Sequence, residues 1–146
     1  MFKCRYIALF IFTLVLAGCS APTLQVKLNS AKQLNPDPQN RSLPVMVVIY
    51  QLRDDQSFKQ ATFQELWQHD REALAGSILS RREVTIPPNS HLNVKMTRNK
   101  EAAYVGVLAV YRHPSGGKWR AVKRIGRHIG GSTVTVSLKG NRVSIK

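Results

Sequence analysis

Residues 44–52 read PVMVVIYQL. The run is rich in β-branched and aromatic side chains, which favour strands. It opens with a proline, which is tolerated at the first residue of a strand, and it ends at the polar residues 53–56. Because the run is almost continuously apolar instead of alternating, it predicts a central strand.

Alternating apolar and polar residues predict further strands on both sides of this run. They are expected near residues 24–29, 83–86, 92–96, 119–122, 134–138 and 143–145, and residues 102–112, which are apolar and β-rich, predict another central strand. Gly140-Asn141, between the last two, is typical of a two-residue hairpin turn. About eight short strands separated by turn residues predict an all-β fold, a β-sandwich.

Residues 58–80 have a helical period instead. Their large apolar residues recur at helical spacings: Phe63, Leu66, Trp67, Leu74, Ile78 and Leu79. We expect two short helices, at about 62–68 and 71–79, with Thr62 or Ser57 as a cap. The apolar stripe is interpreted as core, so this segment is a short helical insert in the sandwich.

The N-terminal residues have the organisation of a lipoprotein signal. Lys3 and Arg5 precede an apolar run, and Leu16-Ala17-Gly18-Cys19 resembles a bacterial lipobox. We expect a signal peptide at 1–18, a tether at 19–23 lipidated on Cys19, and a sandwich domain at 24–146. The alternative is a membrane-spanning helix, but the apolar run is about half the length that a span needs.

Cysteine and charge limit the classes of function. Cys4 would be lost with the signal and Cys19 would carry the lipid, so no internal disulfide is expected. The formal net charge is +14, and removal of Lys3 and Arg5 would leave +12, because all eight acids follow Cys19. In an exported lipoprotein this charge does not indicate nucleic acid. Anionic headgroups, an acidic protein partner and a plainly solvated surface all remain open.

No motif predicts catalysis. His69, His91, His113 and His128 lack the spacing of metal ligands, and the glycine pairs lack the strand–helix context of a phosphate loop. We therefore predict no enzyme activity, no metal and no cofactor. Two rival hypotheses remain. One is a small ligand or glycan bound in an apolar cleft of the sandwich; the other is a hydrolase in which His69 or His113 meets a carboxylate or serine.

Residues 30–43, between the first two predicted strands, form the candidate binding loop. Its centre consists of Asn35, Pro36, Asp37, Pro38, Gln39, Asn40 and Arg41. Proline restricts the backbone, and Asn and Asp favour turns. Such a loop loses little entropy when it binds. The residues alone leave open whether it recognises a partner or is a plain surface connection.

The order of these features resembles the TssJ (VasD/SciN) lipoprotein family of type VI secretion systems. The resemblance rests on the lipobox, the Asn-Pro loop, PVMVVIYQL at 44–52, the insert from Phe58 to Leu74, and YVGVLAVYR at 104–112 followed by Trp119-Arg120. Pro88 departs from the family, in which glycine is common at that point. The resemblance implies a transthyretin-like β-sandwich, anchored through Cys19 in the outer membrane and facing the periplasm.

The resemblance also implies a partner. It implies that the loop at 33–43, centred on 35–41, binds the periplasmic C-terminal region of the inner-membrane protein TssM, and through TssM connects to TssL. The implied role is mechanical: a lipid anchor at one site and a protein contact at another.

Overall fold

The computed structural model describes residues 18, 20–116, 118–126 and 130–146. In these residues the strands are β1 (Thr23–Leu34), β2 (Val45–Leu52), β3 (Ile78–Ile86), β4 (His91–Thr97), β5 (Tyr104–Val110), β6 (Arg120–Arg124), β7 (Ser132–Gly140) and β8 (Arg142–Ile145). The helices, which all lie between β2 and β3, are α2 (Gln56–Gln60), α3 (Phe63–Gln68) and α4 (Asp70–Ala73).

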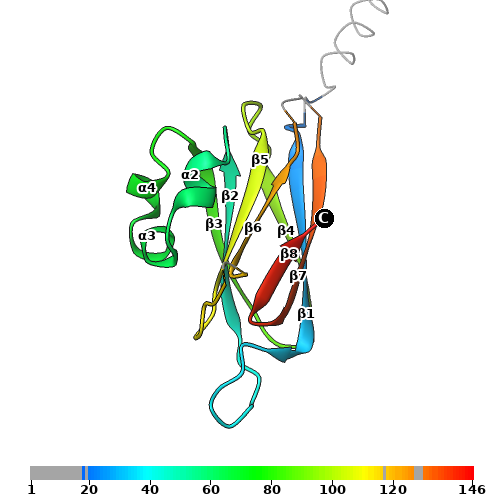
Figure 1. The fold of residues 1–146 in the computed structure, drawn as a ribbon. Helices are drawn as coiled ribbons and strands as arrows, with labels where there is room; N and C mark the ends of the chain where they lie inside the picture. Colours follow the sequence, from blue (N-terminus) through cyan, green and yellow to red (C-terminus); the bar gives the residue numbers. More distant parts are fainter. Residues whose placement is uncertain (1–17, 19, 117, 127–129) are drawn as a thin grey trace, which may run out of the picture.

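Two four-stranded sheets face each other (Figure 1). One has the strand order β4-β1-β7-β8 and the other β3-β2-β5-β6. Neighbouring strands are antiparallel except β1 and β7, which are parallel. The predicted all-β sandwich of about eight strands with a short helical insert is therefore confirmed.

The core lies between the two sheets. Along β1 every second side chain is fully buried, namely Leu24, Val26 and Leu28. Val26 stands opposite Val94 of β4 on one side and Val134 of β7 on the other. Burying one such side chain contributes roughly 1.5–3 kcal/mol. The alternation in the sequence thus marks the inner face of this sheet.

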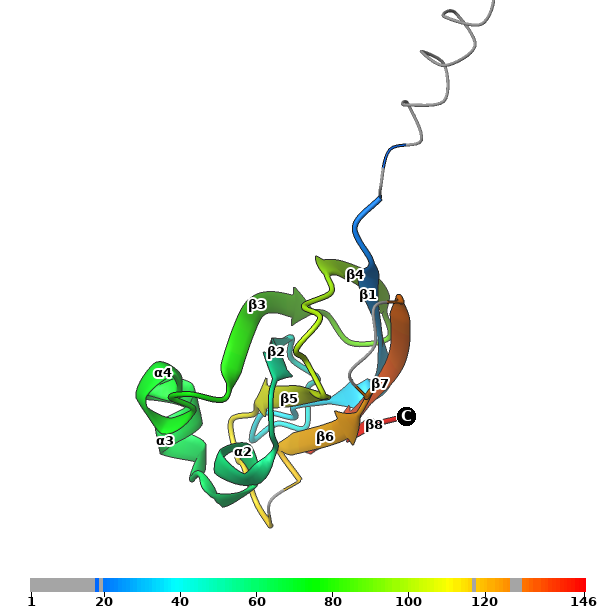
Figure 2. The ribbon, with the colours of Figure 1, turned by 90° about the horizontal axis from the view of Figure 1, so that it is seen from above.

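β2 is covered on both faces, as its continuous apolar sequence predicts. All its side chains are buried except that of the half-buried Met46. The helices pack on the outer face of its sheet (Figure 2). There the rings of Tyr50 and Phe58 pack edge to face, with 5.8 Å between their centroids. Gly106 of β5 leaves room for this contact, because a Cβ there would lie 3.1 Å from the Phe58 ring.

The helical insert starts earlier than predicted. The helix expected at 62–68 is confirmed as α3, and Thr62 is its cap. The Thr62 hydroxyl accepts from the Glu65 N–H, and the Glu65 carboxylate accepts from the Thr62 N–H, so the two form a capping box. α2 was not predicted.

The second expected helix, at 71–79, is present as α4, but its predicted end is wrong. α4 ends at Ala73, and Ile78 already pairs with Leu52 of β2. Pairing along the buried strand β2 outweighs the helical spacing of Ile78 and Leu79 in the sequence. Gly76 lies between helix and strand with φ of +81°, a conformation that glycine adopts without steric cost.

β1 is longer than predicted. Its expected end near residue 29 is wrong, because residues 30–34 continue along β7. Ser30 stands opposite Leu138, and Leu34 stands opposite Gly140 after a register shift. Leu34 is fully buried. The loop between the sheets therefore begins at Asn35 and not at residue 30.

Candidate functional site

Asn35 closes the base of the loop that joins β1 to β2. Its φ is +45°, a left-handed conformation that asparagine tolerates better than most residues. Its side chain is buried: Nδ2 donates to the Pro44 carbonyl at 3.1 Å, and Oδ1 accepts from the Arg112 N–H at 2.9 Å. The Asn35 N–H donates to the Gly140 carbonyl at 2.8 Å. Because these partners belong to both sheets, Asn35 fixes the loop on the end of the sandwich.

A second set of contacts forms the stem of the loop. The Ser42 hydroxyl donates to the Lys32 carbonyl at 2.7 Å and accepts from the Leu34 N–H at 3.2 Å. The Leu43 N–H donates to the Leu34 carbonyl at 3.0 Å. Sequence reasoning missed Ser42 as a support, because a serine beside a proline-containing loop gives no sign of which carbonyl it will meet.

Asp37 organises the tip of the loop. Its Oδ1 accepts from the Gln39 N–H at 2.9 Å and the Arg41 N–H at 2.8 Å, and its Oδ2 accepts from Arg41 Nε at 2.7 Å. The Arg41 backbone N–H is the main reason why the pKa of Asp37 is lowered. Pro36 and Pro38 on either side fix two further φ angles. The loop is therefore held in one shape before any partner arrives.

The predicted site residues separate into supports and tip. Asn35 is buried, and Pro36 and Asp37 are half-buried. Residues 38–41 are exposed, and the Arg41 side chain is 75% exposed. All seven lie in one loop, but Asn35 acts inside the protein, whereas the last four residues present their side chains to solvent.

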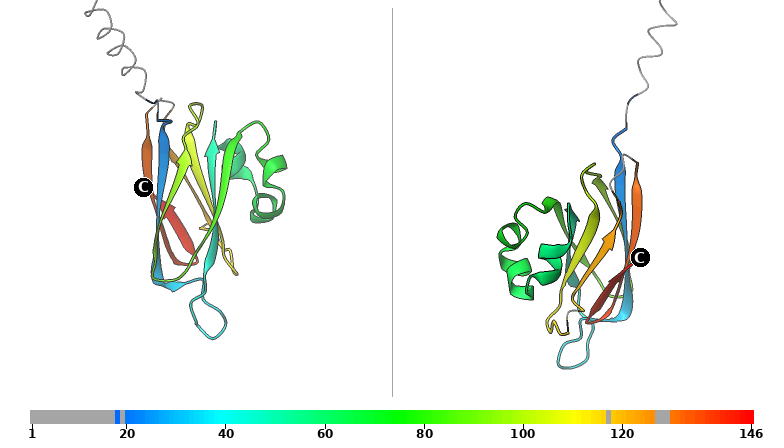
Figure 3. Two further views of the ribbon diagram at one scale, coloured as in Figure 1. Left: turned by 180° about the vertical axis from the view of Figure 1, so that it is seen from behind. Right: turned by 45° about the horizontal axis from the view of Figure 1, so that its top comes forward.

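The loop and the start of β1 lie at opposite ends of the sandwich. β1 runs the length of its sheet from Thr23 to Leu34. The loop protrudes beyond the far end of β1 in Figure 1, and both views in Figure 3 agree. A strand of 12 residues spans roughly 36–40 Å. The loop is thus separated from Thr23 by most of the length of the molecule.

Cys19, the predicted lipidation site, lies outside the described residues, as do residues 1–17 of the predicted signal peptide. Gly18 and Ser20 are described and exposed. Within the described part of the chain, no helix has the length and apolar character to cross a membrane.

Residues 22–141 match the model of a family described as type VI secretion lipoprotein, VasD, EvfM, TssJ. The chain belongs to this family. The match runs from the residue before β1 to the turn before β8, so it includes both the loop and the helical insert of this TssJ-family lipoprotein. It confirms the resemblance found in the sequence. No curated protein matched the chain.

Solved structures of type VI proteins share the fold of this TssJ-family chain. The lipoprotein TssJ1 from Pseudomonas aeruginosa is 22% identical with a TM-score of 0.77, over 87% of this chain and 96% of that one. A chain of a structure described as a type VI membrane complex is 28% identical with a TM-score of 0.77, over 87% and 99%. A chain of a structure described as the TssM C-terminal domain from EAEC is 28% identical with a TM-score of 0.74, over 84% and 99%.

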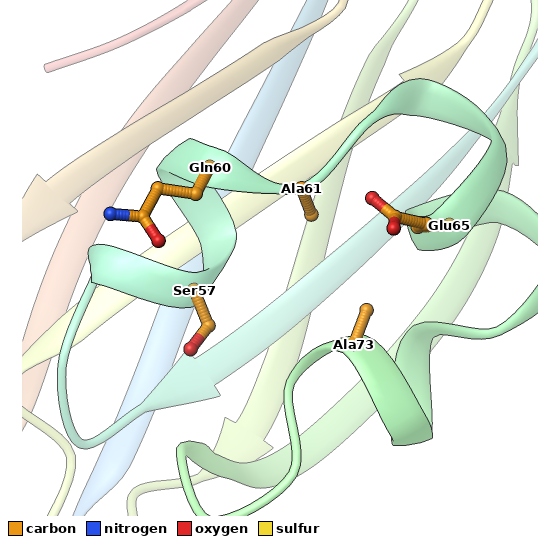
Figure 4. A pocket seen from close by; sticks show the side chains of 5 residues that line it. All are labelled: Ser57, Gln60, Ala61, Glu65 and Ala73. Carbon is orange, nitrogen blue, oxygen red and sulfur yellow. The ribbon is translucent and has the colours of Figure 1, made fainter.

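Two surface pockets of this lipoprotein bear on the rival ligand-binding hypothesis. One, of about 250 Å³, is lined by Ser57, Gln60, Ala61, Glu65 and Ala73 in the helical insert (Figure 4). The other, of about 430 Å³, is lined by Arg53, Asp54, Ala103, Tyr104 and Arg124, at the end opposite the loop. Both have polar linings and neither lies between the sheets, whereas the ligand-binding hypothesis requires an apolar cleft there.

The hydrolase hypothesis required a histidine beside a carboxylate or serine. His69 and His113 are exposed, and among the described residues neither imidazole is hydrogen-bonded to such a group. Asp70 accepts instead from Tyr50 Oη at 2.8 Å and Arg81 Nε at 2.5 Å. The described residues also hold no cluster of three His, Cys, Asp or Glu suited to a metal. The TssJ family is one of secretion lipoproteins and is not a known enzyme family.

Proposed function

We propose that this lipoprotein anchors a type VI secretion complex in the outer membrane by binding the periplasmic C-terminal region of TssM through loop residues 35–41. The acyl chains on Cys19 hold the protein in the membrane leaflet that faces the periplasm. TssM, bound at the loop, connects it onward to TssL. The lipoprotein performs no chemistry in this role and serves as a fixed attachment point.

The placement of the loop and the start of β1 at opposite ends of the sandwich carries this proposal. Only Ser20, Ala21 and Pro22 separate Cys19 from Thr23, so the tether reaches at most about 14 Å. A lipid on Cys19 therefore keeps the Thr23 end at the membrane. β1 then extends the loop roughly 36–40 Å away from the anchor, toward a partner that approaches from the other membrane.

The rigid loop supports binding of a protein. Its Asp37-centred hydrogen bonds and two prolines mean that little conformational entropy is lost on binding. The choice of TssM is supported by the family and by the likeness to chains from structures described as a type VI membrane complex and as the TssM C-terminal domain.

The experiment measures binding of residues 20–146 to the purified periplasmic C-terminal region of TssM from the same genome. A tip variant carries Pro38→Gly, Gln39→Ser, Asn40→Gly and Arg41→Ser. It keeps Asn35, Asp37 and the two backbone N–H groups that bond to Asp37. A control variant carries Gln64→Ser and Gln68→Ser on the exposed face of α3.

We expect the wild-type domain and the α3 control to bind and the folded tip variant to lose binding at least tenfold. Equal binding by all three proteins would retain TssM as the partner and refute the loop as the contact. Failure of the wild-type domain to bind TssM would refute the proposed function itself.

A further inference from the structure

The end of the sandwich that carries the loop is strongly basic. This loop-bearing end comprises residues 31–44, 87–91, 111–116, 118–119 and 139–142, and Figure 1 shows these segments at the end of the sandwich opposite the start of β1. Its Lys and Arg residues, all exposed, are Lys32, Arg41, Arg112, Lys118, Lys139 and Arg142. Asp37 is its single carboxylate in sequence, and the other acids all lie between residues 54 and 101. Apart from Asp37, the acidic side chains therefore lie in the helical insert, in β3 and at the opposite end.

Backbone hydrogen bonds hold these cations around the base of the loop. The Arg112 N–H donates to Asn35 Oδ1, and the Asn35 N–H donates to the Gly140 carbonyl in the turn between Lys139 and Arg142. The Val143 N–H donates to the Lys118 carbonyl at 2.8 Å, which joins β8 to the turn before β6. The basic residues therefore form one surface around the loop.

One pair in this surface opposes the stability of the fold. Lys139 and Arg142 face each other across the β7–β8 hairpin, and like charges directly opposite each other destabilise a strand pair. The one carboxylate at this end, Asp37, already accepts hydrogen bonds from Arg41 inside the loop. Counter-charge for the hairpin cations must therefore come from solvent ions or from a bound partner.

We propose that the loop-bearing end docks onto an acidic patch of the protein that holds the loop, with carboxylates of that partner facing Lys139, Arg142 and their neighbours. This inference rests on the proposed function and adds the chemistry of the partner's surface. A lipid surface fits less well, because this end points away from the Thr23 end, where the anchor is attached. Complementary charge of this kind speeds association and fixes orientation more than it slows dissociation.

The test uses the full-length processed lipoprotein in nonionic detergent and the periplasmic C-terminal region of TssM. Association and dissociation rates are measured at about 50 and about 300 mM salt, where screening is weak and strong. The variant is Lys139→Gln with Arg142→Gln. The matched control is Lys27→Gln with Lys95→Gln, which removes the same charge from exposed positions on the paired strands β1 and β4.

We expect the hairpin variant to associate about three- to tenfold more slowly at low salt, with a smaller effect at high salt. Its dissociation rate should change less than twofold, and the control pair should stay within twofold of wild type throughout. Thermal unfolding of the hairpin variant should be unchanged or shifted upward, because a repulsive pair is removed. Slower binding then reflects lost docking charge and not lost folding.

Several results would overturn the inference. Equal slowing by the hairpin and control pairs would indicate only an effect of net charge. A wild-type association rate that does not depend on salt would refute the acidic patch and leave the proposed function intact. An association rate that is the same in the hairpin variant as in wild type would do the same. If the hairpin variant instead loses binding to phosphatidylglycerol vesicles while TssM association is unchanged, the surface is a lipid site. Absence of wild-type TssM binding refutes the proposed function, and this inference with it.

Discussion

The side-chain carbonyl of Asn35 accepts a 2.9 Å hydrogen bond from the backbone N–H of Arg112, 77 positions away in the sequence. Asn35 follows β1 in one sheet and Arg112 follows β5 in the other. One asparagine thus couples the two sheets at the end from which the loop projects. The direction of the loop depends on this buried contact as well as on the residues of the tip.

Asn35→Ala should lower the free energy of unfolding by about 2–4 kcal/mol. The change leaves the Arg112 N–H and the Pro44 carbonyl without their partner, and alanine tolerates φ of +45° poorly. Urea denaturation measures the loss. Asn40→Ala is the matched control, because Asn40 also has a positive φ, of +61°, but is exposed. Equal losses in the two variants would show that strain alone, and not the buried hydrogen bonds, accounts for the effect.

Asp37 should make the order of the loop tip depend on pH. Hydrogen bonds from Arg41 lower its pKa below the ordinary value of 3.8. A lowered folded-state pKa means that the stabilisation is complete above about pH 4 and is lost as the pH falls through the folded-state value. Amide chemical shifts of Gln39 and Arg41, followed by NMR from pH 7 downward, should therefore stay constant until below pH 4. Asp37→Asn should remove this transition.

A second carboxylate serves as the comparison for Asp37. Asp54 accepts a backbone hydrogen bond from the Gln56 N–H at 3.2 Å and follows the end of β2, the strand whose start adjoins the loop. Asp54→Asn should leave the Gln39 and Arg41 amide titrations unchanged. A transition at Arg41 that persists in Asp37→Asn would show that another group controls the loop.

Tyr50→Phe should weaken the attachment of the helical insert to the sheet without affecting the rest of the sandwich. The Tyr50 hydroxyl donates to the Asp70 carboxylate at 2.8 Å, in a buried site where burial is the main reason why the pKa of Tyr50 is raised. Loss of this bond should cost about 1–3 kcal/mol, since Asp70 stays buried and, among the described residues, keeps only Arg81 as a side-chain donor. Hydrogen exchange should then increase in α3 and α4 and remain unchanged in β1 and β7. Uniform acceleration throughout the sandwich would contradict a local role.

The strands that form the core could be read from the sequence because burial on one face or on two leaves a direct pattern. β2 is apolar throughout because it meets the other sheet and the helices, and β1 and β7 alternate because one face is buried. The loop tip could be placed for a similar reason, since Pro36, Asp37 and Pro38 act through local geometry. Features that depend on neighbouring residues can therefore be predicted from the sequence.

Features that depend on distant partners could not be predicted. Arg98 falls in a polar turn of the sequence, yet it is 3% exposed and donates to the Ala102 carbonyl at 3.2 Å. Ile78 has a helical spacing, yet it belongs to β3 because β2 offers it a partner. The support that Asn35 receives from Arg112 links segments far apart in sequence. Each of these contacts exists only once the two sheets have come together.

Cys19→Ser should leave the sandwich intact and release the protein from the membrane. The substitution lies three residues before Pro22 in the sequence, and the Pro22 carbonyl accepts from the Arg98 N–H at 2.8 Å. Anchoring by acyl chains depends on about 0.8 kcal/mol for each buried methylene, and without the thiol no chain is attached. Membrane fractionation should find wild type and Ser20→Ala with the outer membrane, and Cys19→Ser in the soluble periplasmic fraction. A Cys19→Ser protein that still fractionates with the outer membrane would refute lipid anchoring. If the released protein still binds TssM, the anchor and the loop act independently.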